Sequence, residues 1–376
     1  MAISSCQSHT EATLSQSERL TDPSCTRDIL VGINYFAGWW EPLPNKWHRH
    51  TSSQSTSSGD DWRGEFPERV PLLGSFNTQE TMNKEIVAAS SHGVDFFLML
   101  WYYNEPDRDR EPHSRRLNNG PKYFIKSPEA GRMKFMVEFC NHPPYEVETE
   151  QQWQQCLESW IEMFKHPSYL RVGGRLVFKV HGGQYFINQN QGDLARCRQQ
   201  LDSLRLAVRK ATGSEMIIGC GVMALDRINA DHPITKLFDF TCTYMDVPPY
   251  PQKPENYPYE MLADMGRAAR LVHYQDAKPY MPYLPGGWCP RPWPDHRAYF
   301  HQPSRQQWTL ELKRMKEDLL SLPNLGLPLP DGSIQPMFSC YAWNEFGEGG
   351  YIAPTAGEGY MKLEAIDEVF GVKKKE

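Results

Sequence analysis

Glu345 and Glu348 stand three residues apart in the segment YAWNEFGEGG, residues 341–350, which otherwise consists mainly of aromatic residues and glycines. If the chain turns helically there, the two side chains share one face with Cβ atoms roughly 5–6 Å apart, and both can act on one substrate. Two acids so close repel each other, so the pKa of one of them should rise. Such a pair can serve as a general acid and a general base near neutral pH. The alternative is a solvated loop with two ordinary glutamates.

The composition narrows the choice of partner. The 376 residues carry a formal net charge of −6, so a broad cationic surface is absent and neither nucleic acid nor an anionic membrane is expected as a partner. Aromatic residues make up 12% of the chain, and aromatic rings offer flat apolar faces to sugars as well as to cores. The nine cysteines include no C-x-x-C pair, which favours free thiols over a disulfide framework or a zinc ribbon.

Residues 1–27 are polar, rich in Ser and Thr, and without apolar periodicity, which predicts a loosely ordered tail before one catalytic domain at 28–376. The N-terminus lacks the charged and apolar regions of a signal peptide, and no stretch of about 18 apolar residues occurs. We therefore expect a cytoplasmic protein, or a secreted one if a signal peptide has been removed.

Short apolar runs alternate with amphipathic ones along the chain. We predict strands at 29–36, 94–102, 133–140, 175–180, 215–222, 238–245, 278–285 and 334–343. We predict helices at 78–93, 148–166, 193–213, near 231–238, and at 259–276, 304–322 and 360–371, with little helical pattern in the polar segment after the second strand. Apolar strands separated by helices indicate a parallel sheet buried on both faces, and eight repeats favour a single α/β domain of the TIM-barrel type, (β/α)₈. An open, doubly wound sheet is the alternative.

A barrel of this kind places its active site at the C-terminal ends of the strands. Polar and aromatic residues do follow the predicted strands, whereas the opposite connections are short and plain. The candidates for substrate binding are Tyr35, Trp39, Trp40, Trp101, Tyr102, Asn104, Glu105, Glu138, Asn141, His142, Lys179, His181, Tyr244, Asp246, Trp288, Arg291, Trp343 and Asn344. The long connection at about 37–77 is either a rim or lid of the mouth or an insertion without function.

Several of these candidates have a second interpretation. The aromatic residues that end the second strand either stack on a sugar or pack the rim. Glu138 lies inside an apolar run, where an acid rarely stays unpaired, so it either contacts substrate or pairs with Lys179, and we favour the pair.

Other chemistries fit less well. GCGVMA, residues 219–224, matches a dinucleotide-binding pattern, but no helix follows at the distance a pyrophosphate needs. His48 and His50 lack a third metal ligand at suitable spacing, and we interpret them as surface or rim histidines, so neither a metal nor another cofactor is expected. A Schiff base on Lys179 is a minor alternative.

The strand ending in WNEFGEG, followed by YIAPT, resembles the glutamate-pair element of glycoside hydrolase family 99-like barrels. That family contains endo-acting α-mannosidases and domains of proteins that build surface glycans. The segments PLLGSFNTQETMNKEIVAASSHGVDFFLMLWYY, HPSYLRVGGRLVFKVH and GGWCPRPW are similar to its first helix and second strand, its fourth strand, and its seventh-strand loop. The resemblance spans about residues 30–371 in spaced pieces, and its glutamate pair is the most specific part.

The resemblance implies retaining hydrolysis of an α-linked, α-mannoside-like glycan, with an oligosaccharide or polysaccharide as substrate. In the family, the first glutamate acts as base on the sugar's own 2-hydroxyl and the second protonates the leaving oxygen, which here are Glu345 and Glu348. Phe346, Gly347 and Ala353 depart from the family's usual pattern, which concerns the identity of the substrate more than the acid pair. The main alternative is a non-hydrolytic carbohydrate-binding or glycan-biosynthesis protein with the same mouth. The oligomeric state is not predicted.

Overall fold

The computed structural model describes residues 28–40, 46–48, 61–103, 114–249, 253–293, 295 and 297–371. The predicted tail of residues 1–27, the candidates Asn104 and Glu105, and His50 lie outside the described residues.

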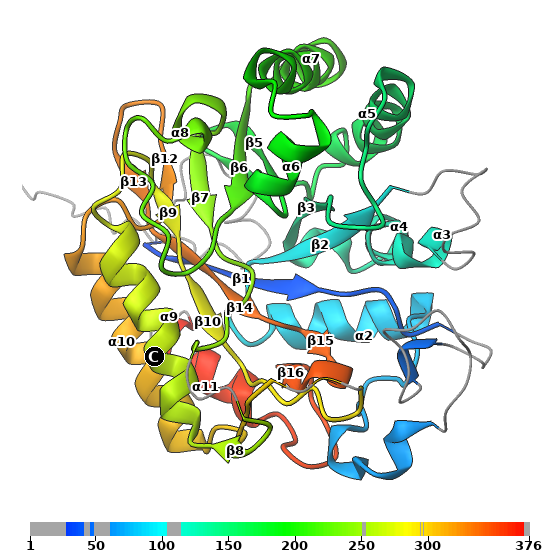
Figure 1. Cartoon of the computed structure of the whole chain (residues 1–376). Coiled ribbons are helices and arrows are strands. Elements are labelled where there is room, and N and C mark those ends of the chain that lie inside the picture. The colour runs from blue at the N-terminus through cyan, green and yellow to red at the C-terminus, as the bar shows by residue number, and fades with distance from the viewer. Residues whose placement is uncertain are drawn as a thin grey trace, which may run out of the picture.

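One parallel sheet forms the centre of the molecule. Its strands are β1 (Leu30–Tyr35), β2 (Phe96–Tyr102), β3 (Lys134–Cys140), β5 (Arg175–Val180), β6 (Met216–Gly221), β7 (Phe240–Cys242), β9 (Tyr280–Met281), β10 (Tyr283–Pro285) and β14 (Met337–Tyr341). They follow the order β10-β14-β1-β2-β3-β5-β6-β7-β9, and Figure 1 shows β1 beside β14. The short β4 (Arg171–Val172) pairs with β5 in the antiparallel sense.

The sheet closes on itself through residues 280–285. Only Pro282 separates β9 from β10, and proline has no N–H to donate to a ladder. This single extended stretch pairs with β7 through β9 and with β14 through β10. The predicted barrel is therefore confirmed, all eight predicted strands are present, and the open sheet is excluded.

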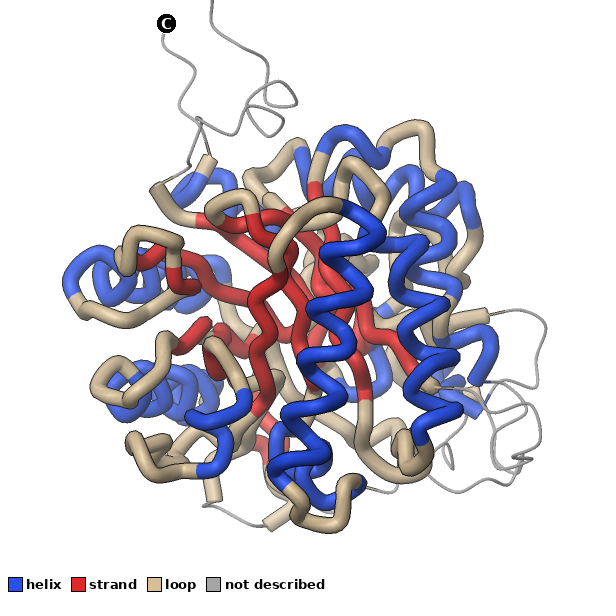
Figure 2. Tube along the Cα trace, turned by 90° about the horizontal axis from the view of Figure 1, so that it is seen from above, coloured by secondary structure: helices blue, strands red, loops and turns tan. Residues whose placement is uncertain are grey.

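The helices lie outside the strands, as Figure 2 shows. They are α2 (Gln79–Ser90), α3 (Ser114–Leu117), α4 (Asn119–Lys126), α5 (Glu150–Phe164), α6 (Gly183–Gln189), α7 (Leu194–Thr212), α8 (Pro233–Leu237), α9 (Tyr259–His273), α10 (Arg305–Ser321) and α11 (Met361–Phe370). Thr149 and Ser304 begin α5 and α10 with capping boxes, and Gly213 ends α7 at a φ of 69°.

The expectation of little helix after the second strand was wrong for α4. This helix has only eight residues, and it buries Phe124 while it packs on α2 and β2. A helix this short depends on tertiary packing rather than on propensity, so the sequence pattern does not reveal it.

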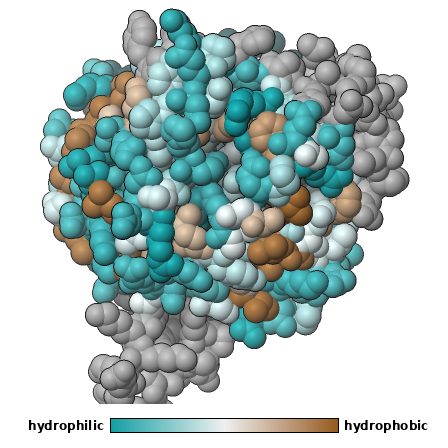
Figure 3. All heavy atoms as spheres, turned by 90° about the horizontal axis from the view of Figure 1, so that it is seen from below, coloured by the Kyte–Doolittle hydropathy of each residue, from teal (hydrophilic) through white to brown (hydrophobic). Residues whose placement is uncertain are grey.

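The thiols agree with the prediction from the cysteine pattern. The seven cysteines among the described residues are free, as predicted, and all seven are buried. No helix in the described part of the chain is long and apolar enough to cross a membrane. On the face shown in Figure 3, hydrophobic residues form small groups among hydrophilic ones.

Candidate active site

The two glutamates lie on a tight hairpin directly after β14. β15 (Asn344–Glu345) and β16 (Gly350–Tyr351) pair in the antiparallel sense, and the single 3₁₀ turn η5 (Phe346–Glu348) joins them. Gly349 ends this turn at a φ of 71°, a conformation that side chains rarely tolerate. A Cβ on Gly350 would lie 2.1 Å from the ring of Tyr341, so a glycine is required for this ring to lie against the hairpin.

Both carboxyl groups have raised pKa values. Burial is the main cause for Glu345, which is 6% exposed, and the charge of Glu348 adds to the rise. The Tyr244 hydroxyl donates a hydrogen bond of 2.8 Å to Glu345 and acts in the opposite direction. Burial also raises the pKa of Glu348, whereas a hydrogen bond from Tyr341 and the charge of Arg297 lower it. The repulsion expected between two neighbouring acids therefore contributes to the raised pKa of Glu345, whereas burial is the larger cause for both groups.

A cavity of about 650 Å³ opens beside the second acid. Glu348, Tyr341 and Tyr244 line it, and its other lining residues are Met223, Met245, Asp246, Val247, Pro248, Pro249, Trp288, Arg297 and Ala298. Glu345 does not line this cavity but reaches it through its hydrogen bond to Tyr244. The volume is typical of a site for a small ligand.

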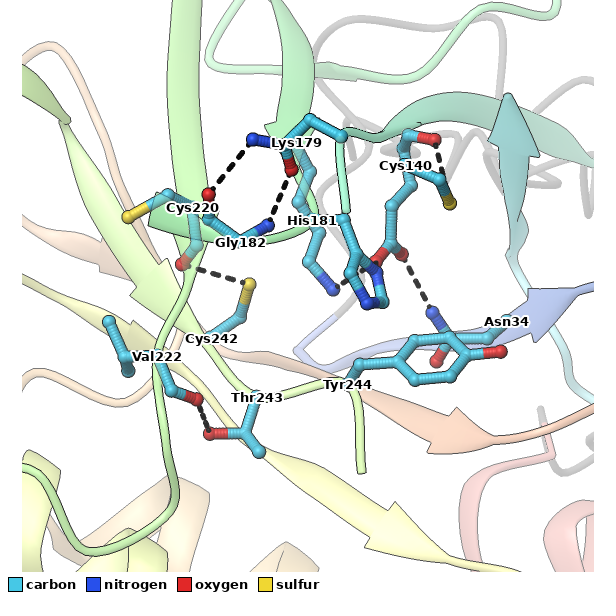
Figure 4. A network of polar contacts seen from close by, with 12 residues as sticks. Asn34, Cys140, Lys179, His181, Gly182, Cys220, Val222, Cys242, Thr243 and Tyr244 are labelled. Carbon is cyan, nitrogen blue, oxygen red and sulfur yellow. Dashed lines mark hydrogen bonds and ion pairs between the residues drawn. The ribbon is translucent and has the colours of Figure 1, made fainter. Parts of the chain in front are cut away.

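Figure 4 shows a buried network of polar contacts that includes Lys179, His181 and Asn34. Glu138 on β3 and Lys179 on β5 are fully buried, and their Oε1 and Nζ atoms are 2.8 Å apart, which confirms the predicted pairing. Glu138 also accepts from the Asn34 amide at 2.9 Å and contacts Nδ1 of His181 at 2.7 Å. Lys179 and His181 hold the pKa of Glu138 low despite its burial. The carboxylate is therefore fixed by three neighbours.

Tyr244 connects this network to the acid pair. Its ring centroid lies 4.9 Å from that of His181 and 5.2 Å from that of Tyr341, and Nζ of Lys179 lies 5.6 Å from it. Because its hydroxyl bonds to Glu345, one side chain contacts both groups of ionisable residues.

Two further candidates join the ends of β3 and β5. The Asn141 amide exchanges hydrogen bonds of 2.9 and 3.1 Å with the backbone of Gly182. The ring of His142 lies 5.6 Å from His181 and 6.2 Å from Tyr102. Burial, and then the charge of His181, lower the pKa of His142 to about 4. His142 is therefore neutral near pH 7.

Four residues that we predicted to contact substrate form hydrogen bonds with other protein groups instead. They are Tyr35, Trp39, Trp343 and Asn344. Glu85 on α2 accepts from the Tyr35 hydroxyl at 2.7 Å and from Nε1 of Trp343 at 3.0 Å. Nε1 of Trp39 donates to the carbonyl of Asn344 at 2.7 Å, and the Asn344 amide exchanges hydrogen bonds with the backbone of residue 36. None of the four lines the cavity. They attach the segment after β1 and helix α2 to the hairpin.

Other candidates lie in separate places. Trp101 packs on Trp160 at 5.1 Å and lines a second cavity between α4 and α5. Trp40 is buried with Arg116 at 5.9 Å from its ring, and Arg291 lies 4.6 Å from the ring of Tyr299. Asp246 and Trp288 do line the main cavity.

Sequence reasoning missed four residues of this site. Asn34 could have been found from the alternation of side chains along β1, which turns it to the opposite face from Tyr35. Tyr341 could have been found by the same rule applied to the end of β14. Arg297 lies 4.5 Å over the ring of Trp288. Arg69 belongs to the long connection after β1 and donates to the carbonyl of Phe346 at 3.0 Å, so this part of the connection is attached to the hairpin. No sequence pattern marks Arg69 or Arg297.

Two alternative chemistries find no support in these contacts. His48 is 1% exposed against Trp39, so the expectation of a surface or rim histidine was wrong, and burial and Arg63 lower its pKa to about 3. No group of three or more metal-binding side chains occurs among the described residues. Burial lowers the pKa of Lys179, but Cys242 and Glu138 raise it more, so its amine stays protonated and is a poor nucleophile for a Schiff base.

Solved structures with a similar fold exist, although no family model and no curated protein matches the sequence. Among solved structures, a glycoside hydrolase-like protein matches with a TM-score of 0.59 and 14% identity, over 92% of this chain and 95% of that one. The GH99 endo-α-mannosidase from Bacteroides thetaiotaomicron matches with a TM-score of 0.57 and 15% identity, over 92% and 98%. An exo-β-1,4-mannosidase from Opitutaceae bacterium strain TAV5 matches with a TM-score of 0.50 and 11% identity, over 95% and 62%. The chain thus shares its fold with glycoside hydrolases.

Proposed function

We propose that residues 28–376 form one catalytic domain that hydrolyses an α-linked, α-mannoside-like glycan with Glu345 and Glu348. The observation that carries this proposal is the hairpin after β14, which presents two interacting carboxyl groups with raised pKa values beside a cavity. The structural likeness to a GH99 endo-α-mannosidase supports the choice of substrate. An oligosaccharide or polysaccharide is the partner, and no cofactor takes part.

The surroundings of the two acids support different roles. Glu348 lines the cavity and Glu345 does not, so Glu348 can reach a leaving oxygen bound there, which suits it to be the general acid. Glu345 is then the base, as in the family that the sequence resembles, and the hydrogen bond from Tyr244 favours its carboxylate against the burial and the charge of Glu348 that raise its pKa. Because the two carboxyl groups interact, they titrate as a pair, and the proton that they hold cannot be assigned to one residue alone.

The proposed reaction retains the anomeric configuration, and the position of the two acids supports this choice. Ordinary glycosidases place their two acids on either side of the scissile bond, whereas here both come from one short hairpin. Glu345 removes the proton of the 2-hydroxyl, whose oxygen attacks C1 while the leaving oxygen departs with the proton of Glu348. Water then opens the resulting anhydro-sugar at C1, as Glu348 takes the water's proton and Glu345 returns a proton to O2. The anomeric configuration is thereby kept.

The experiment is an assay of reducing ends released from α-mannans and bacterial polysaccharides by the wild-type protein, Glu348→Gln and Glu317→Gln. Glu317 is an exposed glutamate of α10 and provides the matched control. We expect release by the wild type and the control but not by Glu348→Gln, with the α-anomer as the first product by proton NMR. Binding of the glycan without release by the wild type would favour the non-hydrolytic carbohydrate-binding protein instead.

A further inference from the structure

Five of the residues that line the main cavity have aliphatic or thioether side chains and come from two segments. Met223 follows β6, and Met245, Val247, Pro248 and Pro249 follow β7. We call these five residues the apolar wall. Met223 is 58% exposed although it is a large apolar side chain. Exposed apolar residues are common singly, but here five from two segments line the same hollow.

Polar contacts hold the two segments of the apolar wall in place. The carboxylate of Asp246 accepts from the backbone N–H of Ala224 at 3.0 Å and from that of Val247 at 3.0 Å. The Thr243 hydroxyl donates to the carbonyl of Val222 at 3.0 Å, as Figure 4 shows. These bonds join the segment after β6 to the segment after β7. The wall is therefore a preformed part of the cavity.

The position of the wall relative to the two acids indicates which part of a substrate it meets. Glu348 lines this cavity and Glu345 does not. In the proposed reaction Glu348 protonates the leaving oxygen, so the leaving group occupies the side on which Glu348 is accessible. That side is the cavity with the apolar wall.

The chemistry of the wall then restricts the leaving group. Thioether, isopropyl and pyrrolidine side chains offer no hydrogen bond that would replace the water around a sugar hydroxyl, so burying a hydroxyl against them is unfavourable. Burying alkyl or aryl surface against them is favourable. Trp288 adds an aromatic ring on the same cavity. A leaving group with an apolar part therefore fits the apolar wall better than an unmodified sugar does, while Asp246 and Arg297 leave polar groups on the same cavity.

We propose that the cavity binds an apolar aglycone, so that the substrates include α-glycosides whose leaving group carries an alkyl or aryl portion. This inference rests on the proposed function, because Glu348 defines the leaving-group side. The five residues of the apolar wall determine the specificity for the aglycone, and the sugar itself lies toward Glu345 and Tyr244.

Binding of paired glycosides tests the inference without requiring turnover. Calorimetry would compare hexyl with methyl α-mannoside, α-glucoside and α-galactoside, on the wild type and on Met223→Gln/Val247→Thr. Both substitutions keep side-chain size and add polar atoms. The matched control is Met261→Gln/Val87→Thr, on the outer helices α9 and α2, where both side chains are 36% exposed.

For at least one sugar, we expect the hexyl glycoside to bind at least about tenfold more tightly than its methyl partner. The free energy gained by burying several methylene groups is larger than the free energy that corresponds to a tenfold change in affinity. The preference should fall below about threefold in Met223→Gln/Val247→Thr and persist in the control. Equal affinities in all three wild-type pairs, or a preference that survives in Met223→Gln/Val247→Thr, would overturn the inference. Hydrolysis of α-glycans without a hexyl preference would remove the apolar aglycone site and leave the proposed hydrolase standing.

Discussion

The hydroxyl of Tyr244 donates a hydrogen bond of 2.8 Å to Oε1 of Glu345. It thereby joins the end of β7 to the hairpin that follows β14. The ring of Tyr244 also packs on the ring of His181. His181 in turn forms a hydrogen bond with Glu138. The base of the proposed reaction is thus supported by the charge network of the barrel.

Tyr244→Phe should shift the acidic limb of the pH profile of kcat/KM to higher pH by about one unit. The hydroxyl stabilises the ionised form of Glu345, so its removal raises the pKa of a base that must be deprotonated. The size follows from a charged hydrogen bond of about 1.5–3 kcal/mol, of which part is replaced by water. Tyr257→Phe serves as control, because the half-buried Tyr257 donates its hydroxyl hydrogen bond to Glu255 rather than to Glu345 or Glu348. An unshifted limb would show that the bond does not act on the base.

Glu138→Gln should lower the free energy of unfolding at pH 7 by about 3–5 kcal/mol, because it leaves the buried ammonium of Lys179 without its partner. Urea denaturation measures this change. The folded-state pKa of Glu138 is lowered, so its stabilisation is present above the unfolded-state pKa of about 4.3 and is lost as the pH falls through the lower folded-state value. The difference between wild type and variant should therefore shrink in acid.

The double variant Glu138→Gln/Lys179→Met distinguishes the effect of an uncompensated charge from the effect of altered packing. Removal of both charges should restore much of the stability, since the penalty comes from one uncompensated charge rather than from a lost contact. A double variant as unstable as Glu138→Gln alone would mean that packing, not charge, dominates at this position.

Glu85→Gln should remove part of the pH dependence of stability between about pH 4.5 and 7. Burial raises the pKa of Glu85 to about 7, so the folded state binds a proton that the unfolded state has released in this interval. Stability contributed by this group is full below the unfolded-state pKa and falls as the pH rises, by up to about 3 kcal/mol. Urea denaturation across this pH interval should show a flatter curve for Glu85→Gln. Glu80→Gln, on the exposed Glu80 of the same helix, should keep the wild-type slope.

The barrel could be predicted because its signals are local and repeated. Each buried strand is a continuous apolar run, and each amphipathic helix carries its own period and caps. The ends of the strands then indicated where Glu345, Glu348 and Tyr244 should lie. The pair of Glu138 with Lys179 was predictable because a buried acid needs a partner and the two stand on neighbouring strands.

The side-chain partners of the aromatic residues could not be predicted in the same way. Tyr35 and Trp343 end strands as a sugar platform would, yet both donate to Glu85, which lies on a helix far away in sequence. Trp101 follows the same pattern but faces α5. A strand end places a residue near the mouth, whereas pleat and neighbouring helices decide whether its side chain enters the cavity. Arg69 reaches the hairpin from a long connection, whose path no local pattern encodes.

The most direct test of the proposed acid–base pair measures how the cleavage rate of Glu348→Gln depends on the leaving group. For the sugar that the wild type cleaves, rates on its methyl and 2,4-dinitrophenyl α-glycosides would be compared among wild type, Glu345→Gln, Glu348→Gln and Glu317→Gln. We expect Glu348→Gln to lose about 10²–10⁴-fold on the methyl glycoside, whose oxygen must be protonated, and less than about tenfold on the dinitrophenyl one. Glu345→Gln should lose activity on both. Wild-type rates in Glu348→Gln, or equal losses on the two glycosides, would contradict the assignment of this pair.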